Sequence, residues 1–160
     1  MHEVVSAYAS LQRGNGAGGD LRRVAAVDVE KEIIVVDDCS SDRTANILRE
    51  IDIAGLQVVR HPVNRGKGAA IHTALQAAQG DAIIIQDADL EYDPQGYSTL
   101  LAPILKGQAQ VVYGVRDIRG QKLLLRLGNL FLTLLTNLLY GVHLHDVETC
   151  YKMAGLRCAP

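Results

Sequence analysis

The sequence predicts an α/β protein with a mainly parallel sheet flanked by helices, because strands of buried type alternate with amphipathic helices along its 160 residues. Two apolar runs, 32–38 and 81–89, are rich in Ile and Val, and each ends in acidic residues. Continuous apolar runs are typical of strands covered on both faces of a parallel sheet. In such folds ligands bind beyond the carboxyl ends of the strands, so the acids mark the edge where we expect a site.

The remaining elements follow in chain order. Ser40, Ser41 and Asp42 offer capping oxygens for a helix over 44–51. Residues 56–61 predict a second strand, and the glycine-rich segment 64–68 opens a helix that we expect to close at Gly80. The second acidic strand is followed by a predicted helix near 97–105 and a predicted strand at 110–116.

Composition limits the classes of protein to consider. The chain is 48% hydrophobic and 21% charged, which is ordinary for one globular domain. The net charge of -2 provides no basic field for nucleic acid, so we expect no nucleic-acid partner. Three cysteines without paired metal-ligand spacing fit a reducing compartment, and the N-terminus shows no secretory signal, so a cytoplasmic location is expected.

The second acidic strand end carries the first candidate site. Asp87 and Asp89 are two residues apart, so an extended backbone aims both carboxylates toward one side, and Glu91 could add a third ligand. Hard oxygen ligands of this kind suit Mg²⁺ or Mn²⁺. The alternative is a pair of solvated loop acids, which the DAD triplet alone does not exclude.

Two other segments lead to the same predicted edge. At the first acidic strand end, Asp38 could accept hydrogen bonds from a ribose hydroxyl or a base edge, whereas helix capping accounts for Ser41 and Asp42. The basic segment 64–68 lies at a predicted helix start, where backbone N–H groups favour an anion. For Arg65 and Lys67, phosphate contact and surface charge both remain open.

The apolar segment 121–142 predicts an amphipathic helix with a narrow polar stripe. Its stripe residues recur at intervals of three and four: Lys122, Arg126, Asn129, Thr133 and Thr136 or Asn137. The polar residues make it a poor membrane-spanning helix. It could instead lie in a membrane interface or form an ordinary buried helix.

In this order, VVDDCSSDRT, NRGKGAA, DADLEYDP and YGVR resemble the family 2 glycosyltransferases, especially those acting on polyprenyl phosphates. The resemblance covers roughly 24–153. It implies a GT-A fold, the nucleotide-diphospho-sugar transferase fold. It also implies transfer of a sugar, with inversion, from a UDP- or GDP-sugar donor to an acceptor, with a lipid phosphate of the polyprenyl type favoured.

The resemblance also implies roles for individual residues. Asp38 matches the acid that binds the nucleoside, Lys67 the lysine at the helix start, and Arg116 an arginine facing the phosphates. Asp87, Ala88 and Asp89 match the DxD motif at the donor and metal, with Glu91 at the position of a further metal ligand. Asp146 matches an acid on the sugar and acceptor side, so Asp89, Asp146 and Arg116 form the implied catalytic set. The same resemblance supports contact of 121–142 with a membrane surface, on its cytoplasmic face.

The chain departs from the family pattern at both ends. We interpret 1–160 as a single domain of this family with an atypical 1–23, where the usual first strand is degraded, and a truncation after about 153. Activity of this chain therefore stays open, with an inactive nucleotide-sugar-binding fragment as one alternative. Gly14, Gly16 and Gly19 create another, because together with Asp38 they match a dinucleotide-binding fingerprint for NAD.

Overall fold

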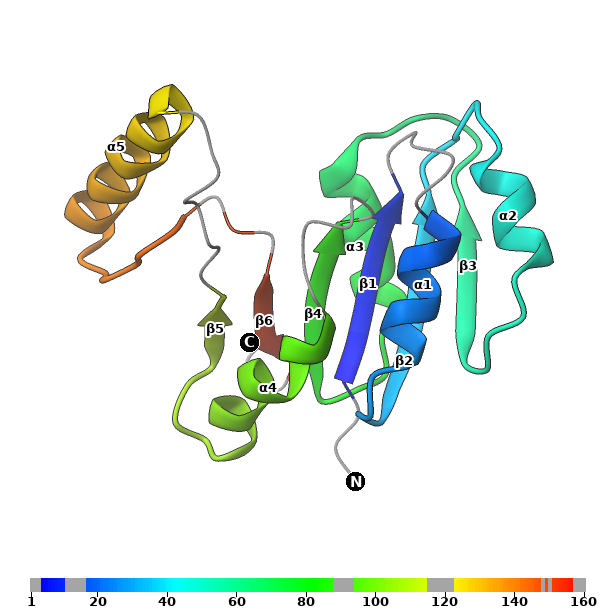
Figure 1. Ribbon diagram of the computed structural model, residues 1–160, viewed down its shortest axis with the longest axis horizontal. Coiled ribbons are helices and arrows are strands. Elements are labelled where there is room, and N and C mark those ends of the chain that lie inside the picture. Colours follow the sequence, from blue (N-terminus) through cyan, green and yellow to red (C-terminus); the bar gives the residue numbers. More distant parts are fainter. Residues whose placement is uncertain are drawn as a thin grey trace.

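A computed structural model describes residues 4–10, 17–87, 94–114, 123–147, 149 and 151–156. Its elements, labelled in Figure 1, are β1 (Val4–Ser10), α1 (Ala17–Ala25), β2 (Lys31–Asp37), α2 (Thr44–Glu50), β3 (Leu56–Arg60), α3 (Lys67–Ala77), β4 (Ala82–Asp87), the 3-10 turn η1 (Pro94–Gly96), α4 (Tyr97–Leu105), β5 (Val111–Tyr113), α5 (Leu123–Tyr140) and β6 (Lys152–Gly155).

The strands form one sheet in the order β3-β2-β1-β4-β6-β5. The pairs β3-β2, β2-β1 and β1-β4 are parallel, whereas β6 runs antiparallel to both β4 and β5. The α/β class and the mainly parallel sheet predicted from the sequence are therefore confirmed. The short strand β6, which the sequence did not predict, inserts between β4 and β5.

The opening segment forms a central strand at Val4–Ser10, although its sequence departs from the pattern expected for a first strand. Seven residues of β1 are in register with β2 and six with β4. A central strand bonds through its backbone on both sides, so the ladder supports β1 although its sequence, VVSAYAS, has few branched side chains.

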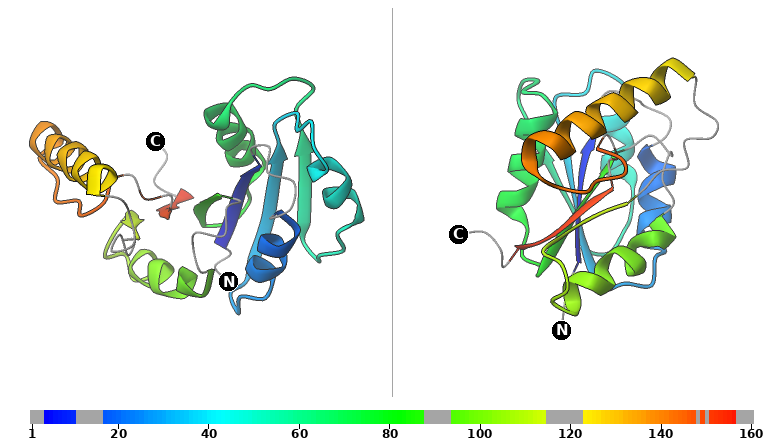
Figure 2. Two further views of the ribbon diagram at one scale, coloured as in Figure 1. Left: turned by 45° about the horizontal axis from the view of Figure 1, so that its top comes forward. Right: turned by 90° about the vertical axis from the view of Figure 1, so that its left-hand side faces the viewer.

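Two apolar clusters cover the two faces of the sheet. On one face apolar residues of α1, α2 and α4 form one cluster with alternate residues of β2, Ile33 and Val35, and with Ile84 of β4 and Met153 of β6. On the other face α3 packs Ala70 and Ala74 against the intervening residues Ile34 and Val36. Figure 2 shows the sheet between these helices. The predicted burial of this strand on both faces is confirmed, and its acidic end is held rigidly at the sheet edge.

Helix α3 ends at Ala77 and not at the predicted Gly80, because Ala78 already has extended backbone angles, φ -67 and ψ 135. The carboxylate of Glu32 accepts the N–H groups of Gln79 (2.6 Å) and Gly80 (3.0 Å). These bonds replace further helical turns and tie the end of α3 to the sheet.

Helix α5 lies away from the main body, at the side of the sheet that carries β5 and β6 (Figures 1 and 2). Its leucines point largely outward: Leu138 is 82% exposed, while Asn129 is 3% exposed. Among the described side chains of α5, from Leu127 onward, the polar residues Asn129 and Thr133 thus face inside, an orientation that the periodicity alone did not reveal. In the described part of the chain, no helix has the combination of length and apolar character that a bilayer crossing requires.

Candidate functional site

The two acidic strand ends predicted from the sequence lie at the same edge of the sheet, the one formed by the carboxyl ends of the parallel strands. Strand β2 ends at Asp37 and β4 at Asp87, and both flank β1. Ser10 of β1 pairs with Asp37 and Ala9 pairs with Asp87. The two ends therefore differ by one residue along β1 and lie two strand spacings apart, roughly 10 Å. The sequence predicted the common edge but not that β1 separates the two ends.

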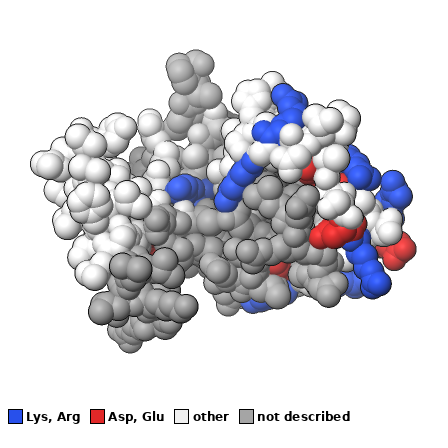
Figure 3. All heavy atoms as spheres, turned by 90° about the horizontal axis from the view of Figure 1, so that it is seen from above, with Lys and Arg blue, Asp and Glu red and all other residues white. Residues whose placement is uncertain are grey.

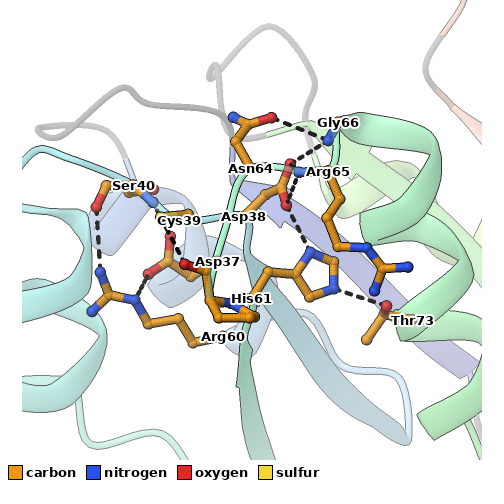
Figure 4. A network of polar contacts seen from close by, with 11 residues as sticks. Asp37, Asp38, Cys39, Ser40, Arg60, His61, Asn64, Arg65, Gly66 and Thr73 are labelled. Atoms are coloured by element: carbon orange, nitrogen blue, oxygen red, sulfur yellow. Dashed lines mark hydrogen bonds and ion pairs between the residues drawn. The ribbon is translucent and has the colours of Figure 1, made fainter.

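Asp38, directly after β2, is the centre of a buried polar network (Figure 4). Its carboxylate accepts hydrogen bonds from Nδ1 of His61 at 2.7 Å, from the N–H of Arg65 at 2.9 and 3.0 Å, and from the N–H of Gly66 at 2.6 Å. Nε2 of His61 lies 2.9 Å from the Thr73 hydroxyl of α3. Asp38 thereby connects the end of β2, the end of β3 and the start of α3.

These contacts determine the charge state of Asp38. Burial on its own would raise the pKa of the carboxyl, since the residue is 2% exposed. The hydrogen bond from His61, the backbone N–H donors of Arg65 and Gly66, and the charge of His61 together hold the pKa below its ordinary value. The carboxylate is therefore ionised near neutral pH.

Asp37 has a different environment from its neighbour. One oxygen accepts the Ser40 N–H at 2.8 Å, and the other lies 3.3 Å from Nε of Arg60. That second oxygen is buried and makes no hydrogen bond of good geometry with the protein. Asp42 accepts the Thr44 N–H at 2.9 Å beside the start of α2, whereas the residue directly before the helix is Arg43, whose side chain makes no capping bond.

The basic segment 64–68 lies where the sequence placed it, at the start of α3. Gly66 precedes the helix with φ +83, a backbone conformation that favours glycine, while Lys67 is the first helical residue. The N–H groups of Arg65 and Gly66 point at Asp38 (Figure 4). The sequence predicted an anion such as phosphate at the helix start. At these two amides the anion is the carboxylate of Asp38.

His61, Arg60 and Thr73 are residues that the sequence reasoning missed. His61 directly follows β3, so the rule that functional groups gather at the carboxyl ends of parallel strands would have identified it. Thr73 lies in the middle of α3, and no sequence signal marks it as a partner of His61.

Asp146, the acid expected on the acceptor side, lies in the loop between α5 and β6. It is 3% exposed and accepts a hydrogen bond from Nδ2 of Asn129 at 3.0 Å. With His143, Leu144 and residues of β5 it lines a cavity of about 350 Å³. Its side chain is thus held beside an open space on the α5 side of the sheet.

The other predicted site residues lie outside the described residues: Ala88, Asp89, Glu91 and Arg116. Of Asp87 the structure describes the backbone, as the last residue of β4. Within the described ranges, no three His, Cys, Asp or Glu side chains are grouped so that they could hold a metal ion. The expected donors, three carboxylates in 87–91, nevertheless have the hard-oxygen chemistry that Mg²⁺ and Mn²⁺ require.

Figure 3 shows the molecule from above, the direction in which the parallel strands end. Basic side chains are spread over the described surface of this face, with fewer acidic ones among them. The described side chains of α5, from Leu127 onward, are white at the left of the view, since no charged residue occurs between Leu127 and Val142.

Comparison with known proteins identifies the family of this chain. Residues 21–154 match the family model described as glycosyl transferase family 2. The dolichol-phosphate mannosyltransferase of Pyrococcus furiosus is 33% identical over 92 residues, which cover 57% of this chain and 26% of that protein. The UDP-N-acetylglucosamine–dolichyl-phosphate N-acetylglucosaminyltransferase of Methanococcus voltae is 28% identical over 139 residues, covering 73% of this chain and 55% of that protein.

A solved structure shows the same fold. The glucosyl-3-phosphoglycerate synthase of Mycobacterium tuberculosis, in complex with Mn²⁺, UDP-glucose and phosphoglyceric acid, superposes with a TM-score of 0.73 at 24% identity, covering 96% of this chain and 56% of that one. The chain spans about half the length of these relatives or less. The match favours the glycosyltransferase interpretation over the dinucleotide-binding one. With the GT-A fold and a family match over most of its length, the chain belongs to glycosyl transferase family 2.

Proposed function

We propose that this chain is a metal-dependent inverting glycosyltransferase that moves a sugar from a UDP- or GDP-sugar to an acceptor, with a polyprenyl phosphate favoured. The observation that carries the proposal is the shared edge of the sheet, where the ends of β2 and β4 lie on either side of β1. Two relatives with dolichyl phosphate in their names support the lipid acceptor, and a neighbour crystallised with UDP-glucose supports a nucleotide-sugar donor.

The donor would lie across this edge. Asp38 would face the nucleoside, and Lys67 and Arg116 would face the phosphates, with the backbone of Ala88 beside them. Asp87, Asp89 and Glu91 would hold Mg²⁺ or Mn²⁺, which when bound neutralises charge on the diphosphate leaving group. In this scheme Asp38 would bind the nucleoside and would also hold the start of α3, because its oxygens already accept hydrogen bonds from His61, Arg65 and Gly66.

The acceptor side would be formed around Asp146. A phosphate acceptor is largely ionised near neutral pH, given a second pKa of about 6, and needs no strong base. Asp146 would then orient the reacting groups, with Asp89 and Arg116 near the diphosphate. For a hydroxyl acceptor, Asp146 would be the base instead.

Helix α5 would contact a membrane surface, on its cytoplasmic face, and so approach a lipid-linked acceptor. Its exposed apolar side chains include Phe131 at 65%, Leu138 at 82% and Leu139 at 68%. An uncharged apolar surface of this kind is typical of helices that lie in the interface of a bilayer.

Titration calorimetry with UDP- and GDP-sugars, with and without Mn²⁺, tests the donor site. We expect binding that requires the metal, that is lost in Asp89→Ala and that persists in Asp52→Ala, since Asp52 is an exposed acid distant in sequence from both motifs. Transfer to a polyprenyl phosphate in detergent then tests the activity.

The same experiment separates the alternatives. Metal-dependent donor binding without transfer would identify an inactive nucleotide-sugar-binding fragment. Binding of NAD, with no heat from any nucleotide sugar, would contradict the proposal and restore the dinucleotide interpretation.

A further inference from the structure

The side of α5 that meets the rest of the protein is polar. Asn129 and Thr133 are 3% and 4% exposed, while leucines around the rest of the helix are exposed. Asn129, Thr133 and Asn137 are spaced four residues apart, so they share one face, and we call them the polar ladder. All three form hydrogen bonds within the ladder or to the loop 144–147, which leads back toward the sheet.

The hydrogen bonds of the ladder have a fixed direction. The Val147 N–H donates to the Thr133 hydroxyl oxygen at 3.3 Å, and the same hydroxyl donates to Oδ1 of Asn129 at 3.3 Å. Because Oδ1 of Asn129 is engaged in this way, its Nδ2 faces the Asp146 carboxylate and donates to it at 3.0 Å. Rotating the amide would place oxygen against oxygen, so the network selects one orientation.

Asn137 fixes the other end of the loop. Its Nδ2 donates to the Leu144 carbonyl at 2.9 Å, and its Oδ1 accepts the Leu144 N–H at 2.8 Å. This double contact satisfies both backbone groups of one residue, as a neighbouring strand would. The loop is thus tied to α5 at Leu144, Asp146 and Val147.

We propose that the polar ladder is a positioning device, in which Asn129, Thr133 and Asn137 hold the Asp146 carboxylate beside the cavity formed by 143–146 and β5. The proposal rests on the proposed function, which places Asp146 on the acceptor side of the site. Neither the ladder nor its link to Asp146 is apparent from sequence periodicity, which marks the stripe as one side of an interfacial or buried helix.

The pattern of burial supports positioning over simple packing. A polar group that is buried without a partner is costly, so three polar residues facing a loop are tolerated only if their bonds are made. Aliphatic residues at 129 and 133 would attach the helix by burial alone, yet they would remove the hydrogen bond that Asn129 donates to Asp146.

Three variants of α5 test the proposal. Thr133→Val keeps the shape and removes the hydroxyl, Thr133→Ser keeps the hydroxyl, and Thr136→Val makes the same chemical change at a half-buried threonine on the same helix. Two readouts apply: hydrogen exchange of the Val147 amide, and kcat and KM for transfer from UDP- or GDP-sugar to a polyprenyl phosphate in detergent.

For Thr133→Val we expect Val147 exchange to accelerate about tenfold, because its bond to the hydroxyl is lost, and kcat to fall about tenfold, because the hydroxyl's bond to Asn129 is lost, with the donor KM unchanged. Thr133→Ser should restore both values, and Thr136→Val should change neither. Equal effects of Thr133→Val and Thr136→Val, or a Ser variant no better than Val, would overturn the proposal.

Failure of the proposed function remains distinguishable. If the wild-type chain neither binds a nucleotide sugar nor transfers one, the glycosyltransferase proposal fails, and the exchange of Val147 alone decides whether the ladder holds the loop. If transfer occurs but exchange is unchanged in Thr133→Val, the ladder does not position Asp146.

Discussion

At the scale of single residues, the connection between Asp38 and the start of α3 determines the geometry of the candidate donor site. The carboxylate accepts two backbone amides from the basic segment and the imidazole of His61. A negative charge at this position satisfies N–H groups at the helix start and interacts favourably with the charge of His61. Under the proposed function, Asp38 would therefore link protein stability to binding of the nucleotide-sugar donor.

Replacement of Asp38 by Asn should lower stability by about 2 kcal/mol, because one acceptor oxygen becomes a donor that faces other donors. The stability contributed by the ionised carboxylate should also depend on pH. Since the folded pKa is depressed, this contribution is present above the unfolded pKa of about 3.9 and is lost as the pH falls through the folded value.

Urea unfolding between pH 3 and pH 7 measures both effects. The wild type should lose stability on the acid side of pH 4 more steeply than Asp38→Asn, with Asp52→Asn as an exposed control. Parallel acid limbs for all three proteins would show that Asp38 does not contribute in this way.

Two glycines in the basic segment should respond in opposite ways to alanine. Gly66 has φ +83, so Gly66→Ala should destabilise by about 1 kcal/mol through backbone strain, although open space surrounds the position. Gly68 is helical with no neighbour within 4 Å of an added Cβ, so Gly68→Ala should stabilise by about 0.5–1 kcal/mol. Thermal unfolding of both variants checks the sign, and two changes of the same sign would refute the conformational argument.

At the scale of elements, α5 is the helix whose orientation runs against the usual rule for a surface helix. Leucines on its outer side are exposed, and its amides and hydroxyls point inward. Such a helix has a partner for its polar face within the chain, while its apolar face is available for a nonpolar phase.

Substitution of Leu138 by Gln should therefore leave the stability of the protein within about 0.5 kcal/mol, because the side chain is 82% exposed. Its binding to phospholipid vesicles should weaken about tenfold or more, as expected for a leucine that enters an apolar phase. Leu105→Gln, at an exposed leucine of α4, is the control. Sedimentation with vesicles that is equal for wild type and Leu138→Gln would contradict membrane contact by this face.

At the scale of the whole molecule, the sequence predicted the elements that are buried along their whole length. It did not predict the arrangements that depend on contacts between segments far apart in the chain. Strands β2 and β4 were predictable because each is a continuous run of branched apolar residues. Strand β1 was missed because alanine and serine occupy a central position that backbone pairing on two sides supports. Periodicity identified the polar stripe of 121–142 but could not tell which side of the helix faces the protein.

The candidate site was predicted in part for the same reason. The acids at 37–38 and 87 could be assigned to strand ends, since a strand pattern shows where it stops. The partners of Asp38 could not, because His61, Gly66 and Thr73 reach it only through the parallel arrangement of β2, β3 and α3. The other predicted site residues, Ala88, Asp89, Glu91 and Arg116, stay predictions.

The insertion of β6 between β4 and β5 has a consequence for the time course of synthesis. One edge of β4 has no strand partner until Lys152–Gly155 have been made and have returned from α5. At about 5–20 residues per second, roughly 3–13 s separate translation of Asp87 and Lys152. During that interval the nascent chain would expose an apolar strand edge of the kind that promotes aggregation, and the arrival of β6 would cover it.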